Sequence, residues 1–239
     1  MLSAARAKEL IEFYKNINLK QTDNELMDEA LTHPSYNSER NILDGKDYER
    51  LEFLGDSVLR LSVSNFLYEK YPEYQEGELT KIRSCLVSDS FLFKISSKID
   101  IAKYINIGKH EEKSGGRHKE SIIACAMEAV IGAIYKISGF EKAKNYVYSL
   151  YEDINIKEEM YNFNSKEILQ EYTQAQNKDL PEYRVIGETG KEHNKTFEVS
   201  VYYQNKELGK GFGKTKREAE KEAALSAIKF LKISEDKTE

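Results

Sequence analysis

The stretch Glu49–Leu59, which reads ERLEFLGDSVL, decides the fold of the first part of this chain. Its apolar residues Leu51, Leu54 and Val58, followed by Leu61, recur at spacings of three and four residues. This periodicity predicts an amphipathic helix that buries one face. The remaining positions of the stretch are rich in acidic residues, and these indicate what the helix can bind.

Three carboxylates share one stripe of this predicted helix. Glu52 and Asp56 are four residues apart and Glu49 precedes Glu52 by three, so their side chains lie on one face. Like charges at these spacings destabilise an isolated helix, and a hard divalent cation such as Mg²⁺ would neutralise them through oxygen ligands. The spacing alone leaves a solvated acidic face as the alternative. Gly55 costs about 1 kcal/mol in a helix interior, which indicates that a neighbouring element approaches closely.

A second predicted helix, residues 119–138, carries Glu128 in the middle of a broad apolar surface. A carboxylate in that position must find a partner or take up a proton. A structural salt bridge and a metal ligand are therefore both open. Small residues on the same helix would let another helix approach closely, and these are Ala124, Ala129, Gly132 and Ala133.

The composition is that of a soluble globular protein, with 40% hydrophobic and 32% charged residues. No run of about 20 apolar residues exists, so we expect no membrane span. The N-terminus has no apolar core like that of a secretory signal. Cys85 and Cys125 are the only cysteines, which makes a disulfide framework unexpected and fits a cytoplasmic protein.

The net charge of −5 is unevenly distributed along the chain. Residues 164–239 contain 14 basic and 14 acidic side chains, a net charge of zero, whereas residues 1–163 contain 22 and 27 and carry the whole −5. An acidic part whose carboxylates bind metal, joined to a neutral part with a local basic cluster, is compatible with a polyanionic partner.

Helical periodicity continues through most of residues 24–153. The residue before a proline is pushed out of the α region, so the sequence Tyr71-Pro72 ends the first helix. Residues 109–118 form a predicted polar loop. The predicted helices are residues 24–35, 48–70, 78–99, 119–138 and 140–151.

The pattern changes after a polar, acidic stretch at residues 154–163, which predicts a linker. A helix over residues 165–176 is followed by strands over residues 182–189, 196–203 and 206–212 and by a helix over residues 215–231. The second strand is rich in β-branched and aromatic residues. Gln204-Asn205 fits a tight hairpin turn between the second and third strands.

Basic residues gather where the last predicted helix begins. Thr215 fits the N-cap position, and Glu218 three residues later completes a capping box. Lys214, Lys216 and Arg217 would then crowd a helix N-terminus, where the dipole and the unpaired N–H groups favour anions. This pattern indicates a phosphate partner, with a solvated basic turn as the alternative. Three glycines would let the backbone approach such a partner closely, and these are Gly209, Gly211 and Gly213.

Over Glu49–Leu59 the chain resembles, almost letter for letter, the signature helix of the ribonuclease III family. The block around Glu128 is similar to the second motif of that family, and residues 164–232 resemble the double-stranded RNA-binding domain. The resemblance implies an all-α endonuclease domain followed by a small α+β (α-β-β-β-α) double-stranded RNA-binding domain. The implied limits are residues 1–153 for the endonuclease domain, 154–163 for a linker, 164–232 for the RNA-binding domain and 233–239 for a tail.

The resemblance also implies a metal site. By it, Glu52, Asp56 and Glu128 hold Mg²⁺ or Mn²⁺, and Asp56 and Glu128 are catalytic. Glu76 matches an acidic residue near a second metal, although a charge that interacts with a helix N-terminus explains it equally well. Cys125 stands where the family has an aspartate. A thiol holds Mg²⁺ poorly near neutral pH, so it stays open whether Cys125 joins the metal shell.

Further matched residues imply contacts with RNA and with a second subunit. Gln170, Glu171 and Gln174 match residues that reach one minor groove, and His193 matches a residue that enters the next. The basic cluster would span the phosphates between these grooves. Phe53 is implied to pack into the partner subunit of a homodimer. The residues of the basic cluster are Lys214, Lys216 and Arg217.

The function that follows from the resemblance is an endoribonuclease that hydrolyses phosphodiester bonds in double-stranded RNA by divalent-metal catalysis. It would process structured RNA precursors, such as ribosomal RNA, and messenger RNA in the cytoplasm without binding a membrane. The alternative is a catalytically impaired double-stranded RNA-binding protein of the same architecture. Cys125 favours this alternative, whereas the retained carboxylates favour the enzyme.

Overall fold

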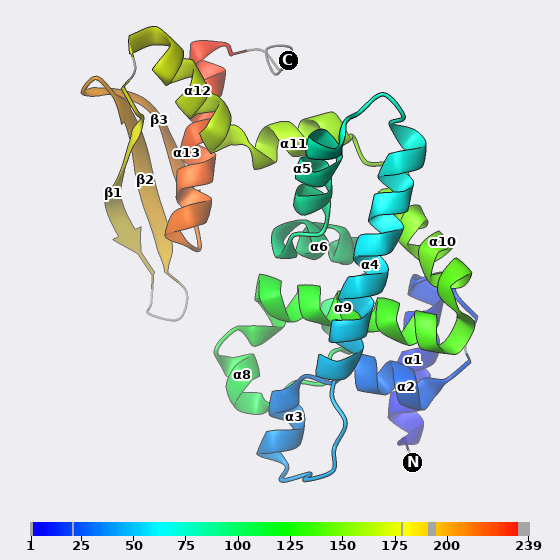
Figure 1. The fold of residues 1–239 in the computed structure, drawn as a ribbon. Helices are drawn as coiled ribbons and strands as arrows, with labels where there is room; N and C mark the ends of the chain where they lie inside the picture. Colours follow the sequence, from blue (N-terminus) through cyan, green and yellow to red (C-terminus); the bar gives the residue numbers. More distant parts are fainter. Residues whose placement is uncertain (1, 21, 178, 191–194, 234–239) are drawn as a thin grey trace. The chain divides into compact units, whose positions relative to one another are not determined.

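A computed structural model describes residues 2–20, 22–177, 179–190 and 195–233. The chain divides into two compact units, Met1–Ile154 and Asn155–Glu239. The first unit is helical, and the second is a three-stranded sheet with helices (Figure 1). This order confirms the predicted architecture of an all-α part followed by an α+β part.

The helices of the first unit are α1 (Ala4–Asn16), α2 (Asn24–Ala30), α3 (Pro34–Glu39), α4 (Glu49–Lys70), α5 (Glu76–Leu86), α6 (Asp89–Ser96), η1 (Ser97–Ile99), α7 (Ile101–Tyr104), α8 (Lys109–Lys113), η2 (Gly116–His118), α9 (Glu120–Ser138) and α10 (Phe140–Tyr151). The predictions of α4, α9 and α10 are confirmed. The sequence patterns missed α1, α7 and α8, the last of which lies inside the predicted polar loop.

The prediction of one continuous helix over residues 78–99 is wrong, because the chain breaks between α5 and α6. The Ser88 hydroxyl donates to the carbonyl of Cys85 at 2.7 Å and accepts from the N–H of Phe91, so it caps the new helix. The buried hydroxyl of Tyr151 donates to the carbonyl of Leu86 at 2.8 Å, which satisfies a carbonyl at the end of α5. The predicted helix over residues 24–35 likewise breaks, because Pro34 begins α3.

α4 and α9 cross in direct backbone contact in the middle of the first unit (Figure 1). A Cβ on Gly55 would lie closer than 3.0 Å to the carbonyl oxygen of Glu128, and one on Gly132 would lie closer than 3.0 Å to the carbonyl oxygen of Leu51. Real Cβ atoms do not approach other atoms so closely, so only glycine fits at either position. The close approach predicted from Gly55 is confirmed.

The buried face of α4 differs from the predicted stripe at one position. Leu51, Gly55, Val58 and Ser62 face the core together with neighbouring residues of the helix. Leu61, which the spacing placed on this face, is exposed. A helix advances 100° per residue, so the buried stripe drifts to Ser62 and leaves Leu61 on the open side.

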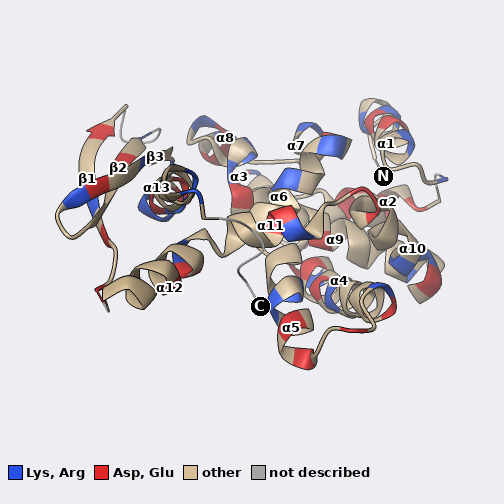
Figure 2. Ribbon diagram, turned by 90° about the horizontal axis from the view of Figure 1, so that it is seen from above, with Lys and Arg blue, Asp and Glu red and all other residues tan. Residues whose placement is uncertain are grey.

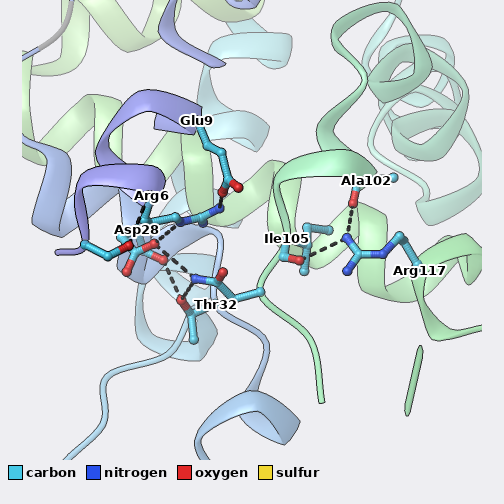
Figure 3. Close-up of polar contacts among 9 residues, drawn as sticks. Arg6, Glu9, Asp28, Thr32, Ala102, Ile105 and Arg117 are labelled. Carbon is cyan, nitrogen blue, oxygen red and sulfur yellow. Dashed lines mark hydrogen bonds and ion pairs between the residues drawn. The ribbon is translucent and has the colours of Figure 1, made fainter. Parts of the chain in front are cut away.

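Two arginines, Arg6 and Arg117, join separate segments of the first unit (Figure 3). Arg6 of α1 pairs with Glu9 at 2.9 Å and with Asp28 of α2, and Asp28 also accepts from the amide of Asn106 at 3.0 Å. Arg117 of η2 donates to the carbonyls of Ala102 and Ile105 and thereby holds the segment after α7. These contacts tie the segments around the beginning of α9 to the rest of the unit.

The second unit contains α11 (Ile156–Phe163), α12 (Ser165–Asn177), β1 (Glu182–Thr189), β2 (Thr196–Tyr203), β3 (Lys206–Gly213) and α13 (Lys216–Leu231). The strands are antiparallel in the order β1-β2-β3. Gln204 and Asn205 have positive φ angles of 50° and 62°, which confirms the tight hairpin turn. Leu169, Val199 and Ala223 lie in the core between the sheet and the helices.

The predicted linker at residues 154–163 is largely helical. Asn155 caps α11 by accepting from the N–H of Glu158, and the Tyr161 hydroxyl donates to the carbonyl of Ile233 at 3.0 Å. Tyr161 also packs against the core of the second unit. α11 therefore belongs to that compact unit, whereas the proposed domain limits stay predictions.

Candidate active site and RNA-binding surface

The crossing of α4 and α9 brings the three carboxylates predicted for the metal site together. Glu128 is half-buried at this crossing, and its pKa is raised to about 8, first by burial and then by the charges of Asp56, Glu52 and Asp89. Among the described residues Glu128 has no ion-pair partner, which favours the interpretation as a metal ligand over that of a structural salt bridge. Two carboxylates from α4 and one from α9 therefore form a region of negative charge that a cation would stabilise.

Cys125 lies one turn before Glu128 on α9, and its side chain is hydrogen bonded to Glu52. Burial, this hydrogen bond and the charges of Glu52 and Glu128 raise the pKa of the thiol to about 12. The thiol therefore stays protonated and donates to the Glu52 carboxylate. A protonated thiol orients Glu52 but supplies no anionic ligand.

Asp89 is an acidic residue of the site that the sequence patterns did not reveal. It is the first residue of α6, which packs on α9, and its charge raises the pKa of both Cys125 and Glu128. In the described part of the chain Asp89 has no ion-pair partner. The prediction of one helix over residues 78–99 hid it, because a helix that begins at residue 89 was not expected.

Arg60 is a second unpredicted member of the site. Its Nε donates to both carboxylate oxygens of Asp56, at 2.7 and 2.9 Å, and its charge lowers the pKa of Glu128. Residues 2–20, 22–177, 179–190 and 195–233 hold no group of three His, Cys, Asp or Glu side chains arranged to ligate a metal, and Asp56 is paired with Arg60. The donors fit Mg²⁺ or Mn²⁺ because all are carboxylate oxygens, and a bound cation would favour the charged form of Glu128 that burial and the neighbouring carboxylates disfavour.

The two outer acidic residues lie apart from Glu128. Glu76 is the exposed first residue of α5 and accepts from the Thr80 hydroxyl at 2.9 Å. Glu49 is the exposed first residue of α4. No hydrogen bond or ion pair of the described residues joins either one to Glu128. Both fit a charge that interacts with a helix N-terminus, and the role of Glu76 at a second metal stays a prediction.

α4 also carries an apolar stripe that its own unit does not cover. Phe53 is 80% exposed, and Leu61 and Tyr68 are exposed large hydrophobic residues on the same side of the helix. This exposure is compatible with the implied packing of Phe53 into a partner subunit, which stays a prediction. Large exposed apolar groups at helical spacing are typical of an interaction surface.

In the second unit, the residues predicted to contact RNA lie on the surface. Gln170, Glu171 and Gln174 are exposed on α12. Lys216 and Arg217 are exposed in the first turn of α13, and Figure 2 shows segments of this helix in the blue of Lys and Arg. His193 falls outside the described residues.

The beginning of α13 has the predicted capping geometry. The N–H of Glu218 donates to the Thr215 hydroxyl at 3.1 Å, and the Glu218 carboxylate accepts from the N–H of Lys214 at 2.7 Å. The capping box is confirmed. The Nζ of Lys214 lies 3.4 Å from the Thr196 hydroxyl, which ties the turn to β2.

The three glycines of β3 have a different role from the one predicted. A Cβ on Gly209, Gly211 or Gly213 would lie closer than 3.0 Å to backbone nitrogens of α13. The glycines therefore face α13 and let it pack directly on the strand. The corresponding nitrogens belong to Ala227, Ala223 and Ala219.

The two units match two family models. Residues 23–154 match the model described as Ribonuclease-III-like, and residues 165–231 match the model described as Double-stranded RNA binding motif. Together these matches cover most of both units.

Similar proteins of known family extend over nearly the whole chain. Ribonuclease 3 of Listeria welshimeri is 41% identical over 221 residues, which are 92% of this chain and 96% of the relative. Ribonuclease 3 of Treponema denticola is 42% identical over 232 residues, which are 96% of this chain and 94% of the relative.

Among solved structures, the nuclease domain of ribonuclease III from Campylobacter jejuni is similar to this chain. One structure, which concerns flexibility in a region involved in dimer formation, has a TM-score of 0.55 at 37% identity and covers 59% of this chain and 94% of that domain. A second structure of the same domain has a TM-score of 0.57 at 35% identity and covers 62% and 97%.

Proposed function

The chain belongs to the ribonuclease III family and is an endoribonuclease with a double-stranded RNA-binding domain, and from this premise we propose that it hydrolyses double-stranded RNA with a divalent metal ion held by Glu52, Asp56 and Glu128. The convergence of these carboxylates at the α4–α9 crossing carries the proposal. The charges of Asp56 and Glu52 both act on Glu128, so a cation bound there would stabilise all three.

The proposed metal is Mg²⁺ or Mn²⁺, and it would lower the pKa of a bound water and neutralise charge on the reacting phosphate. Glu128 has its pKa at about 8, so near neutral pH it holds a proton that it must release to act as a ligand. Metal binding should therefore become tighter as the pH rises toward 8. The Cys125 thiol would orient Glu52 by donating to its carboxylate.

RNA binding by the second unit would use shape rather than sequence. Lys214, Lys216 and Arg217 would contact phosphates, and Gln170 with its neighbours on α12 would reach a minor groove and its 2′-hydroxyls. His193 would enter the next minor groove. Recognition of A-form shape is compatible with structured precursors of ribosomal and messenger RNA as substrates. We place these substrates, and the protein, in the cytoplasm.

We propose that the protein acts as a homodimer. The exposed stripe of Phe53, Leu61 and Tyr68 on α4 supports this, because burial against a second copy would remove large apolar side chains from water. A two-fold dimer would provide two sites for the two strands of a duplex. No membrane role is proposed, because α9, which is long and apolar enough to span one, is mostly buried among other helices.

The variant Glu128→Gln tests the proposed site. It preserves the shape of the side chain but weakens the ligand, so cleavage of long double-stranded RNA with Mg²⁺ should fall at least about 100-fold. RNA binding in a gel-shift assay should stay within about twofold, because the RNA contacts lie in the other unit. Glu25→Gln, an exposed change on α2, is the matched control. Unchanged cleavage by Glu128→Gln would contradict the proposal, and so would a parallel loss of RNA binding.

The alternative is a double-stranded RNA-binding protein with impaired catalysis, which the protonated Cys125 thiol favours. Cys125→Asp would add one anionic group, which should lower the Mg²⁺ concentration needed for cleavage. Wild-type protein should cut more strongly with Mn²⁺, which binds more tightly and tolerates softer ligands. If the wild type cuts with neither ion whereas Cys125→Asp does, the alternative is correct.

A further inference from the structure

The ion pair between Arg60 and Asp56 joins a catalytic candidate to a fixed cation on its own helix. The guanidinium Nε donates to both oxygens of Asp56, at 2.7 and 2.9 Å. Arg60 follows Asp56 by four residues, so α4 itself holds the two side chains together. The exposed fraction of the side chain is 55% for Arg60 and 33% for Asp56, so the pair lies at the surface of the site.

This pair competes with any metal for the same oxygen atoms. Both oxygens of Asp56 accept from the Nε of one guanidinium group, so one lone pair on each oxygen is directed toward Arg60. The positive charge of Arg60 also reaches Glu128, where it opposes the charges of Asp56, Glu52 and Asp89. Arg60 therefore neutralises part of the same charge that a divalent ion would neutralise.

We infer that Arg60 is a positioning residue that holds Asp56 when no metal is bound, so that metal binding is an exchange of Asp56 from Arg60 to the ion. The inference rests on the proposed function, and it adds that Arg60 determines the metal concentration at which the site is filled. An exposed pair four residues apart is weak, so a divalent ion can displace it. The positive charge that remains nearby nevertheless opposes the ion, and the chain should therefore need a higher metal concentration.

The closing experiment measures metal binding without RNA. Mn²⁺ is titrated into the full-length chain at pH 8, and free Mn²⁺ is followed by electron paramagnetic resonance for the wild type, Arg60→Ala, Arg60→Lys and Glu128→Gln. Arg60→Ala should lower the dissociation constant about three- to tenfold, because a nearby positive charge is removed. Arg60→Lys keeps the charge but lacks the planar fork, so its dissociation constant should stay near that of the wild type.

A matched control separates this effect from a general change in charge. Lys136 is an exposed residue in the last turn of α9, eight residues beyond Glu128. Lys136→Ala removes the same charge from the same unit and should leave the dissociation constant within about twofold of the wild type, because screening weakens its effect. Equal tightening by Lys136→Ala and Arg60→Ala would overturn the inference.

The remaining outcomes distinguish the inference from the proposed function. If Glu128→Gln loses Mn²⁺ binding but Arg60→Ala binds like the wild type, the inference is wrong and the proposed metal site stands. A lower melting temperature of metal-free Arg60→Ala, with unchanged Mn²⁺ binding, would show that the Arg60–Asp56 pair only stabilises α4, and the inference would be wrong. If the wild type binds no Mn²⁺, or Glu128→Gln binds it equally well, the proposed site is wrong and the inference falls with it.

Discussion

At the scale of single residues, Glu128 couples the stability of the metal-free protein to pH. Its pKa is about 8 in the folded chain against an ordinary value of 4.5. Between these values the folded state binds more protons than the unfolded state, so the free energy of unfolding falls as pH rises. The contribution of protonated Glu128 to the free energy of unfolding is fully present below about pH 4.5 and is lost as the pH rises through about 8.

Glu128→Gln should remove this dependence. Glutamine stays neutral, so in the presence of a chelator the variant should exceed the wild type at pH 8 by a free energy of unfolding on the order of 1–2 kcal/mol, after allowance for partial exposure. At pH 5 the two proteins should be nearly equal. Denaturant unfolding at both pH values, followed by circular dichroism, measures the difference. Equal stability of the variant and the wild type at pH 8 would show that the charged Glu128 carboxylate does not destabilise the folded protein.

The residues of the site differ in how far the sequence reveals them. Glu52, Asp56 and Glu128 were predicted, because carboxylates on two helical faces with glycine nearby indicate a shared site. The Asp56–Arg60 spacing of four was also readable from the sequence and was missed. Asp89 was missed because the helix break before it was not expected, although Ser88 is a residue type that favours an N-cap.

At the scale of elements, the contact of α4 with α9 depends on Gly55. Gly55→Ala would place a Cβ against the carbonyl oxygen of Glu128, so the two helices must separate. We expect a loss of about 2 kcal/mol or more in the free energy of unfolding, because overpacking outweighs the better helix propensity of alanine. Cleavage should fall as well, because Glu128 moves relative to Asp56.

Gly77→Ala is the matched control for this prediction. Gly77 lies in α5, and a Cβ there would have no atom within 4 Å. The substitution should leave stability unchanged or raise it by about 0.5–1 kcal/mol, because alanine favours helix. Thermal unfolding of both variants provides the measurement. If Gly55→Ala were as stable as Gly77→Ala, the close crossing would not exist in solution.

Local periodicity predicted α4, α9, α10 and the three strands well, because each has a regular buried face or a clear turn. It failed at Leu61, since a pattern of apolar residues does not separate a face that meets the core from one that is exposed. It failed again between α5 and α6, where Ser88 caps a new helix and the Tyr151 hydroxyl of α10 donates to the carbonyl of Leu86. The error at Leu61 arises from tertiary packing, which a window of local sequence does not contain, whereas Ser88 was a local N-cap signal that the reading of periodicity missed.

At the scale of the whole molecule, we expect the first unit to carry catalysis and the second unit to carry most of the RNA binding. A fragment of residues 1–154 corresponds to the first compact unit and should fold by itself. It should lose most cleavage at physiological salt and recover part of it at low salt, because the phosphate contacts of the second unit are absent. Circular dichroism and a salt titration of cleavage, compared with the full chain, measure both effects. Cleavage equal to that of the full chain at every salt concentration would contradict this division.

The seam between β3 and α13 has a consequence for how this chain can change. Each of Gly209, Gly211 and Gly213 already has the smallest side chain, and each faces backbone atoms at an alanine. A substitution there can only add volume, and a Cβ at each position would meet a backbone nitrogen of α13, which no change of side chain removes. Substitution of any of these glycines would therefore push the helix away from the strand. The close packing of β3 and α13 thereby fixes the position of the basic residues at the beginning of α13 relative to the sheet.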